Sequence, residues 1–313
     1  YGAPAASRRH GWFIAPDRTS RVSIAPMAKK RAKAPWTAEA LEVFPYRTTG
    51  ILCLVVQSNA DRDAHSSELD VCEDFSTEDP NTVWTLKSWV YSMALGQDET
   101  IYLAHSGKTL RHGPVEDPAV VLTHDHDVTR LCGAREGVYL VGLGGYVGHF
   151  DGKRLRDLPV PDADVFHVTE SADGTLYAAG SHGRVFRRSG TEWIGTKVGD
   201  GADVRHVTAI GAHGVLFAGA EGVCGRLDGD VVTRFEAPRD RDFFAIAEFQ
   251  DRVFVGAGRL GLDVVEADAV VSFKGNVFSF KLHASALHLY ASGSSQAARF
   301  DGEAWLATEF TPA

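Results

Sequence analysis

Residues 174–193 read GTLYAAGSHGRVFRRSGTEW, and this stretch decides the fold of the chain. A short apolar segment carrying an aromatic residue leads through a turn of small residues into a second apolar segment, followed by Ser-Gly and Trp193. Apolar runs this short, bounded by Gly and Ser, are typical of strands joined by tight turns. The stretch therefore predicts consecutive strands of one antiparallel sheet.

The same plan recurs five more times along the chain. Successive aromatic residues lie 36 to 40 positions apart, at Tyr102, Tyr139, Tyr177, Phe217, Phe254 and Tyr290. Each copy has another apolar strand before the aromatic one, and in several copies an Asp-Gly or Ser-Gly hairpin turn leads into a fourth strand. Four-stranded units of this period, with no helical pattern between them, predict the blades of a β-propeller.

A more diverged seventh copy begins at EVFPYRTTGILCLVV (42–56), which overlays DVFHVTESADGTLYA (164–178). We therefore expect an all-β protein, a seven-bladed β-propeller over residues 36–313 preceded by a short basic N-terminal extension at residues 1–35. The predicted blades are 36–89, 90–126, 127–163, 164–202, 203–241, 242–275 and 276–311. Ring closure hides sheet edges, and the strand-like segments 11–16 and 21–26 of the extension can add to a blade edge.

The unit LYAAGSHGRVFRRSGTEW (176–193) resembles the blades of bacterial, WD40-like β-propeller repeat proteins, which have the general form vYavGxxGxvxrxdGxxW. The resemblance extends over about residues 36–310 and is clearest at 164–235 and 287–306. It implies the fold alone, because such propellers serve as scaffolds, lectins, assembly factors and occasionally enzymes. No functional residue is transferred from it.

The segment RVFVGAGRLG (252–261) contains the spacing G-x-G-x-x-G at Gly256, Gly258 and Gly261. A dinucleotide site with this spacing requires a helix after the glycines, whose N-terminal amides hold the pyrophosphate. The following residues, LDVVEADAVVSF, instead predict a strand. We therefore interpret the glycines as a blade turn and do not expect dinucleotide binding.

Charge is distributed unevenly along the chain. Residues 1–35 contain eight Lys or Arg and one Asp, a net charge of +7. Because the whole chain has a net charge of −9, the remaining residues have a net charge of −16. The densest part of this arm is Lys29, Lys30, Arg31 and Lys33. The arm is either solvated against an acidic ring or a tail for nucleic acid or another anionic partner. The propeller itself is too acidic for a general nucleic-acid surface.

The apolar runs and the cysteines of the sequence indicate the cellular compartment of the protein. No run of 18 apolar residues occurs, so no membrane span is expected, and no secretory signal is recognised. The four cysteines are sparse and form no C-x-x-C pair, which favours buried thiols in a reducing compartment. We therefore expect a cytoplasmic protein.

Carboxylates recur at one position of the repeat, the residue just before the first strand of each blade. In blade order this position holds Glu42, Trp89, Asp127, Asp164, Asp203, Asp242 and Asn276. The first strand of a blade lines the central channel, so these residues are expected at the channel mouth. They are interpreted either as acceptors for backbone amides in a repeated tight turn, or as a site for a cation or a basic partner residue.

Basic and titratable residues accompany this ring. Arg130, His167 and His206 each lie three positions after a ring carboxylate, where they either contact a ligand or fill the inner layer of the propeller. The run THDHD contains His124, His126 and Asp127, a pattern that can bind a divalent metal such as Zn²⁺ or Mn²⁺ but is also typical of a polar surface loop. No other cofactor is expected.

Three classes of function are compatible with the sequence: a protein-binding scaffold, a metal-dependent enzyme and a lectin. The absence of a coherent catalytic constellation favours a non-catalytic scaffold that binds a protein partner through the channel mouth and an insertion at 58–82, which carries Asp61, Arg62 and Asp63 and lies near Trp84. One alternative is a metal-dependent hydrolase or lyase using His124, His126, Asp127, Asp164 and His206, which requires these side chains to converge. Another is a lectin, because Trp193 and Trp305 recur on the outer strand.

Overall fold

The computed structural model describes residues 36–46, 50–59, 64–72, 81–96, 98–105 and 108–310. The chain divides into two compact units, Tyr1–Lys33 and Ala34–Ala313, and the described residues belong to the second. The basic cluster of Lys29, Lys30, Arg31 and Lys33 and the strand-like segments 11–16 and 21–26 lie outside the described residues.

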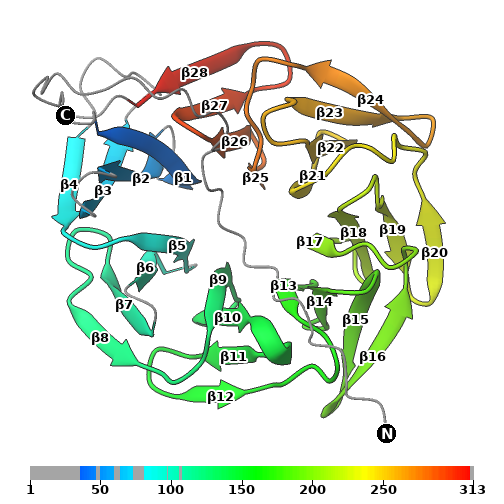
Figure 1. The fold of residues 1–313 in the computed structure, drawn as a ribbon, viewed down its shortest axis with the longest axis horizontal. Coiled ribbons are helices and arrows are strands. Elements are labelled where there is room, and N and C mark those ends of the chain that lie inside the picture. Colours follow the sequence, from blue (N-terminus) through cyan, green and yellow to red (C-terminus); the bar gives the residue numbers. More distant parts are fainter. Residues whose placement is uncertain are drawn as a thin grey trace, which may run out of the picture. The chain divides into compact units, whose positions relative to one another are not determined.

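Seven four-stranded antiparallel sheets surround a common axis (Figure 1). Blade 1 contains β1 (Thr37–Tyr46), β2 (Gly50–Asn59), β3 (Ala64–Cys72) and β4 (Asn81–Leu86). Blade 2 contains β5 (Val90–Leu95), β6 (Thr100–His105), β7 (Thr109–Pro114) and β8 (Val120–Thr123). Blade 3 contains β9 (Val128–Gly133), β10 (Val138–Gly142), β11 (Val147–Phe150) and β12 (Leu155–Asp157).

The remaining blades repeat this arrangement. Blade 4 contains β13 (Val165–Glu170), β14 (Leu176–Gly180), β15 (Arg184–Ser189) and β16 (Glu192–Lys197). Blade 5 contains β17 (Val204–Ile210), β18 (Gly214–Gly219), β19 (Cys224–Asp228) and β20 (Val231–Arg234). Blade 6 contains β21 (Ala245–Phe249), β22 (Arg252–Gly256), β23 (Leu262–Glu266) and β24 (Ala269–Lys274). Blade 7 contains β25 (Lys281–Ala284), β26 (Leu289–Gly293), β27 (Gln296–Phe300) and β28 (Trp305–Glu309). The predicted seven-bladed propeller is confirmed.

The core of the propeller consists of layers between neighbouring blades. Tyr177 of blade 4 packs with Val207 and Phe217 of blade 5, and all three are buried. Phe254 of blade 6 packs in the same way with Leu289 of blade 7. The aromatic residues that mark the repeat therefore stabilise the contact from one blade to the next, which explains why they recur with the period of the blade.

The first and last blades close the ring by packing their faces together. Each is built from one continuous segment of the described chain, with strand order β1-β2-β3-β4 and β25-β26-β27-β28. Tyr290 and Phe310 pack against Ala40 and Val43, and the Ala40 amide donates a hydrogen bond to the Ser294 carbonyl. Closure between these blades uses apolar contacts of the same kind as the other blade junctions.

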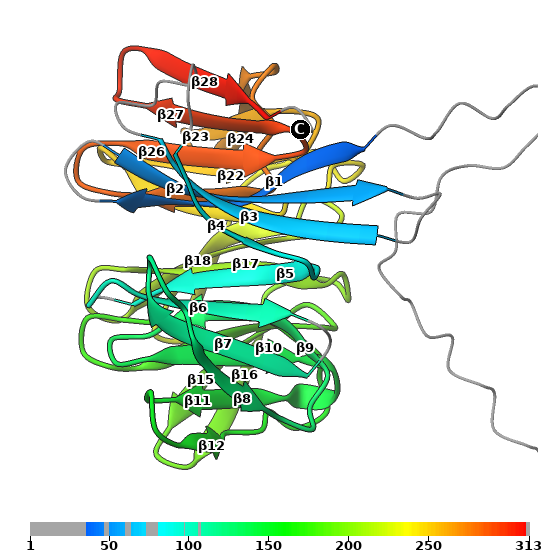
Figure 2. The same ribbon diagram turned by 90° about the vertical axis from the view of Figure 1, so that its left-hand side faces the viewer.

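The two faces of the ring carry different connections. The crossovers between blades and the turns from second to third strand lie on one side, here called the crossover face, and the remaining hairpin turns lie on the opposite face. β1, β2 and β3 have nine or ten residues and extend beyond the other blades on the crossover face (Figure 2). Residues 64–72 of the predicted insertion at 58–82 form the lengthened strand β3, while Asp61, Arg62 and Asp63 lie outside the described residues.

The glycine-rich segment forms a turn within blade 6. Gly258 and Gly261 have φ values of 62° and 104° between β22 and β23, and a strand follows them as predicted. The only helix among the described residues is a single 3-10 turn at Leu143–Gly145. No helix in this part of the chain is long and apolar enough to cross a membrane.

Candidate functional site in the central channel

The innermost strands share an irregularity that sets which side chains reach the channel. β-bulges interrupt the pairing of β1, β5, β9, β13 and β17, leaving one extra residue in each inner strand. The residue after the bulge is Glu42, Ser92, Arg130, His167 and His206 in turn. Lys281 occupies the same pairing position in blade 7, opposite Ser292. These six residues are called the channel layer below.

Three of the predicted ring carboxylates are engaged by the backbone. Asp164 accepts a hydrogen bond of 2.7 Å from the Gly144 amide, Asp203 one of 3.4 Å from His182, and Asp242 one of 3.1 Å from Glu221. Each donor lies in the turn between the second and third strands of the preceding blade. All three donors have positive φ, so each carboxylate holds a turn of its neighbour in a left-handed conformation. The carboxylates thereby link successive blades.

Two members of the predicted ring occupy different positions from the others. Trp89 and Asp127 directly precede β5 and β9, as predicted, but Glu42 lies inside β1 and Asn276 lies five residues before β25. β1 already begins at Thr37, so Glu42 lies within the strand and pairs with Leu54, as His167 pairs with Ala179 in β13, whereas the overlay had matched Glu42 with Asp164. An overlay of apolar residues therefore cannot determine the register of an inner strand.

Glu42 forms the strongest polar contact of the channel layer. Its carboxylate is almost fully buried, 2.9 Å from the Lys281 ammonium and 3.9 Å from the His283 imidazole. Burial alone would raise the pKa of Glu42, but Lys281, His283 and Arg130 together lower it to about 2. Burial and the positive charge of Arg130 lower the pKa of Lys281, which the Glu42 carboxylate partly offsets. Glu42 is therefore ionised at neutral pH and pairs blade 1 with blade 7.

His167 and His206 form a second contact within the layer. Their ring centroids lie 4.0 Å apart, on adjacent blades. Burial holds the pKa of both imidazoles well below the usual value, and the positive charges of Arg130 and Lys281 lower both further. The two rings are therefore neutral at physiological pH, in surroundings whose other charges are mostly positive.

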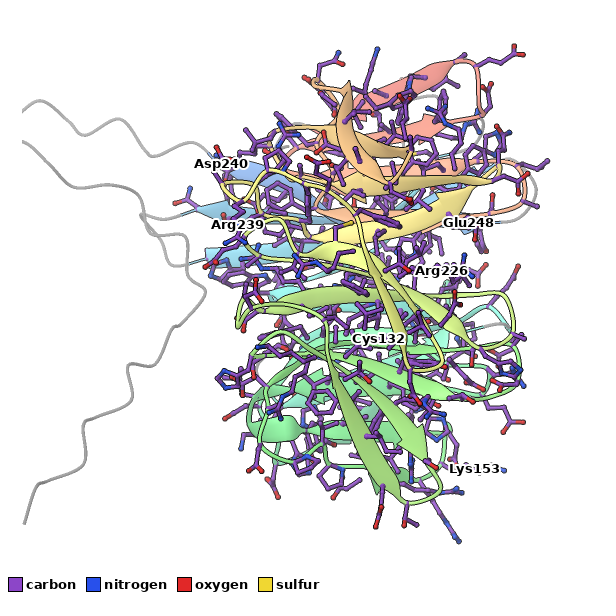
Figure 3. All side chains as sticks on the ribbon, turned by 90° about the vertical axis from the view of Figure 1, so that its right-hand side faces the viewer. Cys132, Lys153, Arg226, Arg239, Asp240 and Glu248 are labelled. Atoms are coloured by element: carbon purple, nitrogen blue, oxygen red, sulfur yellow. The ribbon has the colours of Figure 1, made fainter. Side chains whose placement is uncertain are left out.

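A cavity of about 810 Å³ occupies the channel beside this layer. Residues of all seven blades line it, including Cys132, His167, His206 and His283 in its inner part. Glu248 and Asp251 line it where the inner strands end, toward the opposite face. In Figure 3, Glu248 lies on the side away from Arg239 and Asp240, which belong to a crossover. The channel thus changes from acidic groups near one mouth to basic groups inside.

The residues predicted to bind a divalent metal do not gather together. His126 stacks on Tyr146 with ring centroids 3.8 Å apart, and its Nε2 atom lies 3.7 Å from Asp157. His124 is buried at the end of blade 2, and Asp127 begins blade 3. Among residues 36–310, apart from those outside the description, no three His, Cys, Asp or Glu side chains are grouped so as to hold a metal ion.

The two outer-strand tryptophans take part in packing. Trp193 packs against the core between blades 3 and 4, and its indole N–H donates a hydrogen bond of 3.0 Å to the Leu158 carbonyl. Trp305 stacks on Phe300 with ring centroids 4.7 Å apart. Both indole rings are therefore engaged between strands and blades, whereas a sugar-binding tryptophan presents an open face.

Lys281 and His283 belong to the channel layer and its surroundings but were absent from the sequence-based candidates. A first strand starting directly after Asn276 would put Ser279 at the channel-layer position, whereas the structure puts Lys281 there, two residues later. The usable sequence signal was Gly293 at the end of the second strand. Lys281 pairs with Ser292, the residue before this glycine, as Arg130 pairs with Val141, the residue before Gly142.

Comparison with known proteins supports the class that the fold defines, a seven-bladed β-propeller. No family model matches the chain, and no curated protein matches its sequence. The WD40 β-propeller domain of Doa1 is 12% identical with a TM-score of 0.68, covering 84% of this chain and 93% of that one. Saccharomyces cerevisiae Sqt1 is 11% identical with a TM-score of 0.62, covering 88% and 86%. YCF48 bound to a D1 peptide is 12% identical with a TM-score of 0.57, covering 90% and 94%. At these identities the likeness concerns the fold.

Proposed function

We propose that the protein is a non-catalytic scaffold that binds a protein partner on its crossover face. The observation that carries this proposal is the presence of large exposed apolar side chains on the turns and crossovers of that face. Trp89, Leu143 and Leu260 are 44%, 49% and 58% exposed. Exposed apolar side chains on one face can contribute to a protein-binding surface when one partner covers them together.

Leu260 belongs to a group of side chains that we name the aromatic patch: Arg205, Phe244, Leu260 and Phe280. The Arg205 guanidinium lies 4.9 Å from the centre of the Phe244 ring, and the Phe244 and Phe280 rings are 4.9 Å apart. Both phenyl rings lie against Gly258, the turn residue two positions before Leu260. Aromatic residues and arginine are enriched among the residues that dominate protein interfaces. Rings held by packing lose little side-chain entropy on binding.

The lengthened strands of blade 1 add a second contact region on the same face. Trp89 lies with its ring centroid 5.0 Å from that of His65, a residue of β3. This pair places an exposed indole beside the part of blade 1 that extends beyond the ring. A partner covering both Trp89 and the aromatic patch would contact blades 1, 2, 5, 6 and 7.

The engagement of the ring carboxylates favours binding over catalysis at this face. Asp164, Asp203 and Asp242 already accept backbone hydrogen bonds, so they are poorly placed to converge on a substrate. Among the structural neighbours, YCF48 has been solved with a D1 peptide, and its fold resembles that of this chain. That likeness adds support for a protein partner without identifying one.

The experiment is affinity capture with a matched pair of variants. Leu260 and Leu287 are exposed to similar extents, 58% and 61%, but lie on opposite faces of the ring. Full-length protein is used to identify proteins captured reproducibly, and their dissociation constants are then measured against Leu260→Asp and Leu287→Asp. We expect Leu260→Asp to weaken binding at least 10-fold, about 1.4 kcal/mol, and Leu287→Asp to leave it unchanged. Equal binding by both variants would place the contact elsewhere and overturn the proposal.

A further inference from the structure

The channel contains one positively charged side chain, Arg130, that forms no ion pair with another described residue. Arg130 is half-buried in β9, and its guanidinium makes no hydrogen bond or ion pair with the other described residues. The Glu42 carboxylate, whose pKa Arg130 helps to lower, is paired with Lys281 at 2.9 Å. With neutral imidazoles, the channel layer therefore carries Arg130 and Lys281 against Glu42, an excess of one positive charge.

Two buried ring nitrogens in the same region make no hydrogen bond to another described residue. His167 Nδ1 and His283 Nε2 are buried and make no hydrogen bond within the described residues. The distance from His283 Nε2 to Glu42, 3.9 Å, is too long for one. A buried polar atom left unpaired costs free energy, so such atoms are normally satisfied by protein, water or a bound ligand.

We infer that the channel contains a binding site for a small oxyanion, the carboxylate or phosphate group of a free small molecule, formed by Arg130, His167, Lys281 and His283. Oxygen acceptors match these groups, because guanidinium, ammonium and imidazole N–H are donors. His167 and His283 line the cavity of about 810 Å³, which leaves room for the rest of the ligand beyond its anionic group. The acidic residues Glu248 and Asp251 line the same cavity nearer its mouth, so a ligand with a second, positively charged group would fit it best.

The charges around the imidazoles argue for an anion over a cation. The positive charges of Arg130 and Lys281 both disfavour a positive charge on His167. An arriving anion relieves this repulsion and favours the protonated imidazole, so its binding is accompanied by proton uptake. Affinity is therefore expected to increase as the pH falls from 8 toward 6.

The test uses the full chain and two probes, inorganic phosphate and acetate, each compared with sodium chloride at equal ionic strength. The readouts are the unfolding midpoint and the NMR signals of the imidazole groups. We expect one of the oxyanions to raise the midpoint by several degrees in a saturable manner and to shift the signals of His167 and His283. Chloride at equal ionic strength is expected to do neither. Absence of any oxyanion-specific change would overturn the inference.

Variants separate this site from general charge effects. Arg130→Gln is expected to weaken oxyanion binding at least 10-fold, and Arg130→Lys is expected to weaken it less. The matched control Arg239→Gln is expected to leave binding unchanged, because the Arg239 side chain is 89% exposed on a crossover. If Arg130→Gln does not fold, the comparison rests on Arg130→Lys and His167→Gln. Binding by a folded Arg130→Gln or His167→Gln variant that equals the wild type would refute the site.

A last arm identifies the source of the anionic group. Partner capture is repeated with and without the oxyanion at saturation. Retention of the partner indicates a free small-molecule ligand and supports the inference as stated. Release of the partner by the oxyanion indicates that the partner itself inserts an acidic group into the channel, which contradicts a free small-molecule ligand. The channel site and the crossover-face contact can therefore fail independently.

Discussion

The Lys281 ammonium of blade 7 lies 2.9 Å from the Glu42 carboxylate of blade 1, so an ion pair joins the last blade of the ring to the first. The two residues are 239 positions apart in the sequence. Both face the channel at the level of the β-bulges, and the Glu42 side chain is only 3% exposed. This contact combines with the apolar packing of Tyr290 and Phe310 to close the propeller.

Removing one member of this pair is expected to destabilise the protein more than removing both. Glu42→Gln leaves Lys281 buried without a counter-charge, for which losses of about 3–5 kcal/mol are typical. The double variant Glu42→Gln/Lys281→Met should lose less, because no buried charge remains. Denaturant unfolding measures both, with exposed Glu248→Gln as a control expected to stay within about 0.5 kcal/mol of wild type. A double variant as unstable as Glu42→Gln would contradict this account.

The ion pair also gives the protein an acid limit. The pKa of Glu42 is about 2 in the folded protein, below the 4.5 of an unperturbed glutamate. The unfolded chain therefore takes up a proton first, and the stabilisation, complete above pH 4.5, is lost as the pH falls toward 2. Unfolding measured from pH 6 to 3 should show this loss in wild type and a smaller one in Glu42→Gln.

The neutral histidines of the channel predict a second pH dependence, nearer to physiological pH. Because the pKa values of His167 and His206 are well below 6.5, the unfolded state binds protons that the folded state excludes. The free energy of unfolding should therefore decrease as the pH falls from about 7.5 to 5.5. His167→Gln and His206→Gln should each flatten this dependence, while the exposed His182→Asn should preserve it. Identical slopes in all variants would show that the imidazoles are charged when folded.

The turn-holding role of the ring carboxylates can be tested at Asp164. Asp164→Ala removes the acceptor of the Gly144 amide and should cost about 0.5–1.5 kcal/mol, because water can reach this exposed amide, whereas Asp164→Asn keeps an acceptor and should cost less. Hydrogen exchange at the Gly144 amide should accelerate in Asp164→Ala. If exchange is unchanged while stability falls, the carboxylate acts through another contact.

The cysteines should be unreactive in the folded protein. Cys53, Cys72, Cys132 and Cys224 are all free and buried. Burial raises the pKa of the Cys72 thiol to about 11 and raises those of the other three, so little thiolate forms at neutral pH. Mass spectrometry after alkylation should find none of the four labelled in the native state and all four after denaturation. Rapid labelling of Cys53, Cys72 or Cys224 would indicate local opening of its blade.

The repeat was sufficient to predict the architecture because each blade reproduces the same local pattern. Short apolar strands, turn glycines and an aromatic every 36 to 40 residues specify four-stranded sheets that can bury their faces only against similar neighbours. The positions of Asp164, Asp203, Arg130, His167 and His206 in or beside the inner strands followed directly from this pattern. Local propensity and hydrophobic period are properties of a segment, so they can be read along the chain.

The composition of the channel depended instead on register and on ring closure. A β-bulge moves every following side chain to the other face of its strand, and nothing in the apolar pattern around Glu42 reveals where the bulge of β1 lies. Whether a carboxylate before a strand holds a turn or faces a ligand likewise depends on the neighbouring blade, as at Asp164 and Gly144. Residues far apart in the chain meet only when seven sheets pack around one axis, and the charges of the channel arise from that packing.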